Sequence, residues 1–218
     1  MVKSQQDPLE TLQAIRSMME RSSRFISLSG LSGISAGIVA LLGAAAIYWN
    51  VGMLPFSHKL AYYEAARSGG KSGLPLETFF LLVGALVLLL AIAGGIFFTT
   101  RQARGKGQPI WGPLTQRLLL NLAVPLLTGG VFILALLKYH LIGLVAPSTL
   151  VFYGLALLNA SKYTYNDIRY LGLSEIALGL VGLFLPGYGL ELWSLGFGLL
   201  HILYGALMYY KYERAPQA

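Results

Sequence analysis

The stretch that decides the fold runs from residue 170 to residue 212 and reads YLGLSEIALGLVGLFLPGYGLELWSLGFGLLHILYGALMYYKY. Two apolar helical runs meet in it at the tight turn LPGYG, residues 185–189. Each run carries one ionisable side chain among glycines, Glu175 in the first and His201 in the second. The stretch therefore predicts a helical hairpin with polar groups inside apolar sequence. We expect a functional site to lie there.

The composition of the whole chain predicts that its solvent is lipid. Of the 218 residues, 56% are hydrophobic and 11% are charged, and the mean hydropathy is +0.64. A soluble domain carries about 25% charged residues, and a globule of this size cannot bury so much apolar surface. Cysteine is absent, which excludes a disulfide framework, a thiolate metal site and a cysteine nucleophile.

Six apolar runs approach or reach the ~20 residues that cross a bilayer. They lie near residues 25–48, 78–99, 118–138, 141–158, 170–187 and 190–210. The sequence therefore predicts an all-α fold, an integral membrane bundle of six transmembrane helices.

The distribution of basic residues predicts the orientation of this bundle. Most of the 16 Lys and Arg residues fall in the segments that lie inside when the N-terminus is inside. The outer segments hold Lys59, Arg67, Lys71 and Lys138. Both termini are therefore expected in the cytoplasm, with the chain in the inner membrane of a bacterium. The net charge of +7 follows this topology and does not indicate a nucleic-acid partner.

Residues 1–23 are predicted to form an amphipathic helix at the cytoplasmic face of the membrane. Asp7 suits the N-cap, Pro8 the first helical position, and Glu10 the third position of a capping box. A docking helix for a partner protein is the alternative. The predicted organisation is this helix, a transmembrane domain over residues 24–212, and a short tail over residues 213–218.

Small residues recur at steps of three and four along several of the predicted spans. Such spacing lets helix backbones approach closely in lipid, where no hydrophobic effect drives helices together. The glycines predicted to pack in this way are Gly30, Gly33, Gly37, Gly179, Gly182, Gly198 and Gly205.

The inner half of the predicted bundle holds a candidate polar site. Counted from the cytoplasmic ends, Glu175, His201, Tyr204, Asn159 and Ser32 fall within reach of one another. An intramembrane carboxylate is costly and is a functional-site hypothesis by default. A proton, a cation or a polar ligand would use it, whereas the structural alternative is interhelical hydrogen bonding.

Known chemistries find little support in the sequence. The three histidines sit at different predicted depths, which argues against a b-type haem, and no metal-ligand spacing such as His-Glu-x-x-His occurs. No serine, histidine and aspartate share one face. We expect no metal, no cofactor and no catalytic residues.

The leading interpretation is a non-enzymatic structural or regulatory membrane component. It would act through self-association, or through a cytoplasmic partner bound by residues 1–23 and 159–170. In the second segment Lys162 and Arg169 flank Asp167 closely enough to pair with it. The alternative is a small transporter or ligand-binding bundle, for a proton, a small polar solute or a lipid, centred on Glu175. An enzyme acting on lipid at the inner interface is a weaker third reading.

Overall fold

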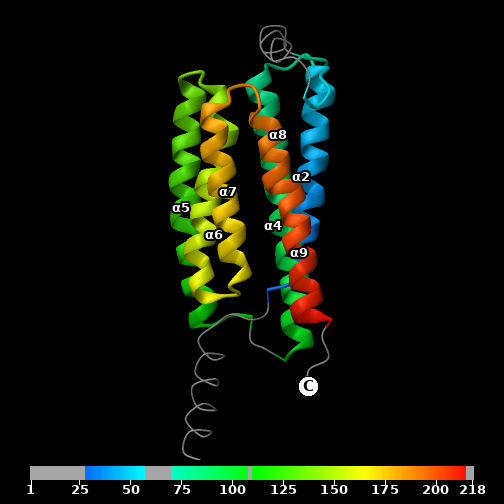
Figure 1. Cartoon of the computed structure of the whole chain (residues 1–218), viewed down its shortest axis with the longest axis vertical. Helices are drawn as coiled ribbons and strands as arrows, with labels where there is room; N and C mark the ends of the chain where they lie inside the picture. The colour runs from blue at the N-terminus through cyan, green and yellow to red at the C-terminus, as the bar shows by residue number, and fades with distance from the viewer. Residues whose placement is uncertain (1–27, 57–69, 108–109, 215–218) are drawn as a thin grey trace, which may run out of the picture.

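A computed structural model describes residues 28–56, 70–107 and 110–214 of the chain. In this part of the chain every regular element is helical, and the long helices run up and down along one axis (Figure 1). The predicted amphipathic helix over residues 1–23 and the last residues of the predicted tail, 215–218, lie outside the described residues.

The first five long helices are α2 (Gly30–Val51), α4 (Leu76–Gly105), α5 (Pro113–Lys138), α6 (Val145–Ala160) and α7 (Asp167–Phe184). The short 3₁₀ turns η1 (Ile142–Leu144) and η2 (Ser161–Tyr163) flank α6. A continuous last helix combines α8 (Gly189–Trp193), η3 (Ser194–Leu200), α9 (His201–Met208) and η4 (Tyr209–Glu213), of which η3 and η4 are π-helical.

Local chemistry explains where these helices begin and end. Ser29 caps α2, because its hydroxyl accepts the Leu31 N–H at 3.2 Å, and Gly52 ends α2 in the left-handed region at a φ of 75°. The predicted fifth span, 170–187, instead begins at Asp167 and ends at Phe184. Pro186 restricts the residue before it, Leu185, to non-helical conformations, so the helix ends at Phe184.

Five helical segments are long and apolar enough to cross a membrane: Gly30–Val51, Leu76–Gly105, Pro113–Lys138, Ile142–Tyr163 and Gly189–Glu213. The helix α7 is not among these five segments. It is an 18-residue helix that carries Asp167, Arg169 and Glu175. The prediction of an all-helical, membrane-type bundle is therefore confirmed for the described residues, with five segments long and apolar enough to span a membrane.

The long helices form two three-helix units that stand side by side (Figure 1). The middle unit contains α5, α6 and α7, with α6 packed against both of the others. The terminal unit contains α2, α4 and the last helix, with α2 packed against both of the others. The short α8 also touches α6 and α7, because it follows the turn after α7.

Glycines bring the backbones together inside each unit. In the terminal unit, a methyl group added at Gly37 would lie 2.6 Å from the carbonyl oxygen of Gly198 on the last helix. In the middle unit, a methyl group added at Gly154 would lie 2.6 Å from the carbonyl oxygen of Gly172. Any side chain larger than hydrogen would separate these helices, which is how small residues hold helices together in lipid.

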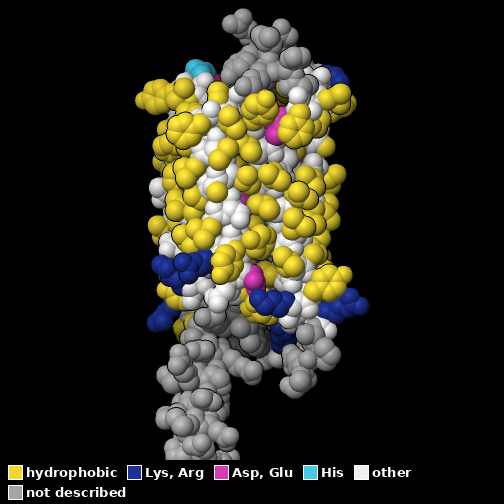
Figure 2. Space-filling view, in the orientation of Figure 1, with side chains coloured by type: hydrophobic (Ala, Val, Ile, Leu, Met, Phe, Trp, Pro, Cys, Tyr) yellow, Lys and Arg dark blue, Asp and Glu magenta, His cyan; other side chains and the backbone are white. Residues whose placement is uncertain are grey.

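The surface of the bundle is apolar along its length and basic at one end (Figure 2). This basic end is where α4 and the last helix finish and where α5 and α7 begin. Its described Lys and Arg residues are Arg101, Arg104, Lys106, Arg117, Lys162, Arg169, Lys211 and Arg214. The opposite end holds Lys71 and Lys138 among the described residues.

Candidate functional site

The centre of the candidate site is Glu175, which α7 presents to the last helix across the interface between the two units. Its side chain is completely buried, at 0% exposure, and neither carboxylate oxygen has a hydrogen-bond partner. A methyl group added at Gly196 would overlap Oε2 of Glu175 and the side chain of Leu150. The glycine at position 196 therefore makes room for the carboxylate between the units.

His201 is the charged or chargeable group nearest to this carboxylate. Its Nδ1 lies 3.4 Å from Oε1 of Glu175 and 3.0 Å from the carbonyl oxygen of Gly196. On the other side of the ring, Nε2 lies 2.8 Å from the hydroxyl of Tyr153 on α6. The imidazole is 5% exposed and bridges α6, α7 and the last helix.

This geometry defines where the protons sit. A carbonyl oxygen only accepts, so Nδ1 of His201 carries a hydrogen that it donates to Gly196. In the neutral ring Nε2 accepts the hydroxyl hydrogen of Tyr153, and in the imidazolium Nε2 donates to the same oxygen. In both forms of the ring, each nitrogen therefore has a hydrogen-bond partner. The carboxylate of Glu175, in contrast, is stabilised only by a proton of its own or by the positive imidazolium.

Aromatic rings enclose the imidazole. Phe197 stacks on His201 with ring centroids 5.8 Å apart, and Tyr153 lies 4.8 Å from Phe197. Trp193 extends the group at 5.1 Å from Phe197. These rings surround the imidazole with apolar surface, and an apolar surrounding raises the cost of any unpaired charge at the site.

The last helix is π-helical where it meets Glu175. The π segment η3 covers residues 194–200 and ends directly before His201. The ring of His201 reaches the carbonyl of Gly196, five positions earlier, which is the separation that a π-helical hydrogen bond spans. Single π turns inside α-helices are common at functional sites.

The structure brings together only part of the predicted polar cluster. Ser32 donates to the carbonyl of Ser29, and Asn159 accepts a hydrogen bond from Lys162 at 3.1 Å, so both make local contacts. Tyr204 packs beside the buried apolar cluster nearer the basic end. Of the predicted partners, His201 is the one placed against Glu175.

Counting from the predicted cytoplasmic ends placed Tyr204 within reach of Glu175, and the observed helix ends explain why His201 takes this place instead. Asp167 pairs with Lys211, so the last helix runs beyond α7 at the basic end. Counted from that pair, Glu175 is eight residues along α7 and His201 ten residues along the last helix, roughly 12 and 15 Å at 1.5 Å per residue. The two side chains are therefore close in depth.

Tyr153 and Gly196 were not predicted as parts of the site. The sequence signal at Tyr153 is a phenol in the middle of a predicted span, away from the headgroup layers where tyrosines usually lie. Gly196 differs from the predicted packing glycines because a methyl group at this position would overlap the carboxylate of Glu175.

A second polar group joins the two units at the basic end. Asp167 accepts hydrogen bonds from Lys211 Nζ, at 3.0 and 3.2 Å, and from the Tyr212 hydroxyl at 2.5 Å. The predicted pairing of Asp167 with its neighbours Lys162 and Arg169 is replaced by this longer-range contact. Asp167 precedes the apolar part of α7. Burial acts to raise the pKa of its carboxyl, but the hydrogen bonds from Tyr212 and Lys211 outweigh burial and hold the pKa below its ordinary value of 3.8.

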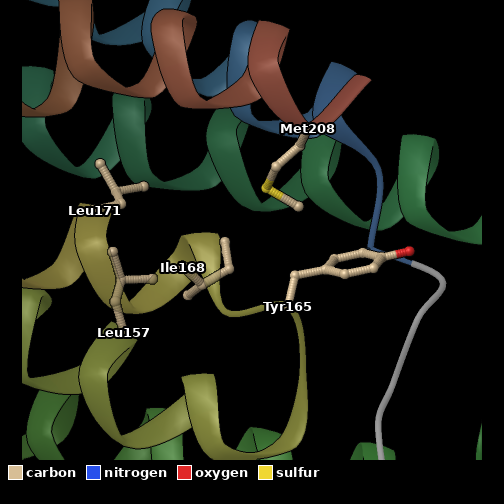
Figure 3. Close-up of a cluster of buried hydrophobic side chains, with 5 residues drawn as sticks. All are labelled: Leu157, Tyr165, Ile168, Leu171 and Met208. Carbon is tan, nitrogen blue, oxygen red and sulfur yellow. The ribbon is translucent and has the colours of Figure 1, made fainter. Parts of the chain in front are cut away.

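A buried apolar cluster packs against Tyr212 of this polar group, and Figure 3 shows its buried residues. Met208 points from the last helix toward Leu157, Ile168 and Leu171 of the middle unit. Tyr165, in the same cluster, stacks on Tyr212 with ring centroids 3.9 Å apart. The basic end of the interface is thus closed by apolar, aromatic and ionic contacts in succession.

Glu213 connects the end of the last helix to the start of α2. Its carboxylate accepts the backbone N–H of Gly30 at 2.5 Å and the hydroxyl of Ser29 at 3.3 Å. The acid at the end of one helix therefore caps the N-terminus of another within the terminal unit.

Among the described residues, no group of three or more His, Cys, Asp or Glu side chains is arranged to hold a metal ion. No protein-family model matches the chain, and no significant match was found among curated proteins or among solved structures. The fold and the site define a membrane-type helical bundle with an acid–imidazole pair buried between two three-helix units.

Proposed function

We propose that this protein is a small proton-linked membrane transporter. Glu175 and His201 bind and release the proton, and relative movement of the two units exposes this pair to one membrane surface and then to the other. The observation that carries the proposal is the fully buried carboxylate of Glu175, which has no hydrogen-bond donor and has an imidazole at 3.4 Å.

The energetics of this pair support a proton as the ion that is carried. A charge in the hydrocarbon region costs on the order of 3 kcal/mol even on insertion scales. The cost is reduced when Glu175 is neutral, or when His201 is positive beside it, and both of these states contain one shared proton. Loss of that proton leaves a buried carboxylate with no donor, which favours opening of the interface to water.

The position of the pair supports transport by movement of two units. In many transporters the site lies near the midplane between two repeats or bundles that rock against each other. Glu175 is close to the midpoint of α7, eight residues from Asp167 and nine from Phe184. It faces the interface between the units and not the glycine contacts within one unit.

The proposed topology has six crossings, with α7 as the sixth, and places the basic end in the cytoplasm. The support is the gathering of Lys and Arg at that end, which follows the positive-inside rule. Both termini then lie on the cytoplasmic side, in the inner membrane of a bacterium.

The test is proton flux into vesicles. Purified protein is reconstituted into liposomes that contain a pH-sensitive dye, and an imposed proton gradient is allowed to collapse with valinomycin and K⁺ present. We expect the wild type to accelerate the collapse and Glu175→Gln to behave like protein-free vesicles. Glu191→Gln is the matched control, because Glu191 lies away from the site and accepts the Phe56 N–H. A wild type no faster than empty vesicles contradicts the proposal.

A structural or regulatory role, through self-association or a cytoplasmic partner, is the second candidate function. The contact between Glu175 on α7 and His201 on the last helix favours it, since such a contact can also hold the two units together. Residues 159–170, with exposed Lys162 and Arg169, offer a partner surface at the basic end. The other predicted partner segment, residues 1–23, lies outside the described residues. This role predicts that Glu175→Gln changes the unfolding temperature and leaves the gradient collapse unaltered.

A further inference from the structure

Three acid–base contacts lie within the described ranges, and all of them join the middle unit to the terminal unit; the two that involve histidine are ionic when the imidazole is protonated. Glu175 pairs with His201 in the middle of the bundle, Asp167 with Lys211 at the basic end, and Glu77 with His140 at the opposite end. Glycine contacts, in contrast, hold α2 against the last helix and α6 against α7 within the units. Ionic contacts thus mark the interface that has to move.

We propose that Asp167 with Lys211 and Tyr212, and Glu77 with His140, are the two gates of the Glu175–His201 site. This proposal rests on the proposed transport function and names its regulation. Each gate closes one end of the inter-unit interface, and each opens in turn to connect the buried pair with one surface.

The spacing of the three pairs fits this arrangement. Asp167 and Glu175 are separated by eight residues of one helix, which is roughly 12 Å. From Glu175 to the other end of α7 is nine residues, roughly 14 Å by the same rise. Each end of α7 is therefore about half a bilayer away from Glu175, and one gate lies at each of these ends of the bundle, so that opening one gate leaves the other closed.

The gate at the basic end has several layers. From Glu175 toward this end α7 carries Leu171, Ile168 and then Asp167, and on the last helix Met208 precedes Lys211 and Tyr212. Met208 lies in the buried apolar cluster (Figure 3), and the ring of Tyr212 stacks on Tyr165. Three hydrogen bonds to the carboxylate of Asp167 complete it. In this structure the site is closed toward the basic end by several layers.

At the opposite end α8 packs against α6 and α7, and the gate residues Glu77 and His140 form an exposed pair. Nδ1 of His140 lies 2.8 Å from Oε1 of Glu77, and the two side chains are 80% and 33% exposed. Exposed ion pairs contribute little to stability. The pair itself therefore opens at low cost, and separating α8 from α6 and α7 adds to that cost.

The gates are tested by the accessibility of a thiol at the site, because the natural chain contains no cysteine. Leu150 is completely buried and lies beside Glu175 across from Gly196, so Leu150→Cys reports on the site. A membrane-impermeant maleimide is applied to intact cells, for the outer surface, and to inverted membrane vesicles, for the inner surface. Labelling is followed by mass spectrometry. Glu175→Cys is the second reporter if Leu150→Cys does not fold.

In this background Glu77→Gln is expected to raise labelling from one surface about threefold or more, and Asp167→Asn from the other surface only. Glu191→Gln, outside both gates, should change neither rate. If each variant raises labelling from the surface expected for the other variant, the gates are supported and the proposed orientation in the membrane is reversed. Unchanged rates, or equal increases from both surfaces in either variant, overturn the gates. Because labelling does not require flux, failed gates and a failed transport function give different results.

Discussion

Substitution of Gly205 by alanine tests the backbone contact that holds the terminal unit together. A methyl group at this position would lie 2.6 Å from the backbone nitrogen of Ile34 and 2.7 Å from the carbonyl oxygen of Gly30. Ordinary contact begins near 3.4 Å, so α2 and the last helix must separate by about 0.8 Å. Overpacking of this kind costs about 1–3 kcal/mol.

The matched control is Gly130→Ala, because nothing lies within 4 Å of a methyl group at that helical position. Both variants gain the same helix propensity, up to ~1 kcal/mol for alanine over glycine, so their difference isolates the steric cost. A difference of ~2 kcal/mol corresponds to about 4–8 °C in a chain of this size. The assay is thermal unfolding in detergent micelles, followed by tryptophan fluorescence. A Gly205→Ala protein as stable as Gly130→Ala would refute the reasoning.

Substitutions at three further positions test contacts other than the glycine contacts between helices. Glu213→Ala removes the acceptor for the Gly30 N–H at the start of α2 and should cost ~1 kcal/mol of unfolding free energy, with Glu213→Gln milder because it keeps an acceptor oxygen. Asn50→Ala removes a buried acceptor for the Ser72 N–H at 2.8 Å and should cost about 1–3 kcal/mol, seen as faster hydrogen exchange at residues 70–74. The pKa of Asp167 is lowered in the folded protein, so its pair stabilises the fold above the ordinary value of 3.8 and is lost as the pH falls through the lowered pKa. The unfolding temperature of the wild type should therefore fall more steeply than that of Asp167→Asn between about pH 5 and pH 3; parallel curves would contradict this.

The helices themselves could be predicted because lipid imposes a length. A run of about 20 apolar residues has few alternatives to a membrane helix. The ends were less predictable, since they depend on caps. The hydroxyl of Ser29 and the ring of Pro186 moved two boundaries by several residues from those expected from hydropathy.

The pairing of helices could not be read from the sequence. Glycine faces occur on α2, on α6 and α7 and on the last helix, and spacing alone does not say which face meets which. The two three-helix units depend on the match of one glycine surface with another, as between Gly37 and Gly198. Only the three-dimensional structure shows which glycine faces meet.

The candidate site was predictable in its centre and not in its surroundings. Glu175 and His201 stand out because ionisable residues are rare in apolar runs. Tyr204 is three residues after His201, and this shift moves it toward the apolar cluster near Met208. No pattern in the sequence predicts the π segment before His201.

Glycine contacts lie within the units and acid–base contacts lie between them, and this difference argues for movement at the interface between the two units. Backbone contacts through glycine tolerate no insertion and have a single geometry, so the two units are rigid. The contacts between the units are made by side chains, namely the three acid–base contacts and the apolar cluster around Met208. The polar ones can be exchanged for water or for other partners. A buried carboxylate without a donor adds a cost that packing alone does not repay. The same carboxylate is useful in a protein whose units separate, because each opening lets it gain or lose the proton that makes closure favourable.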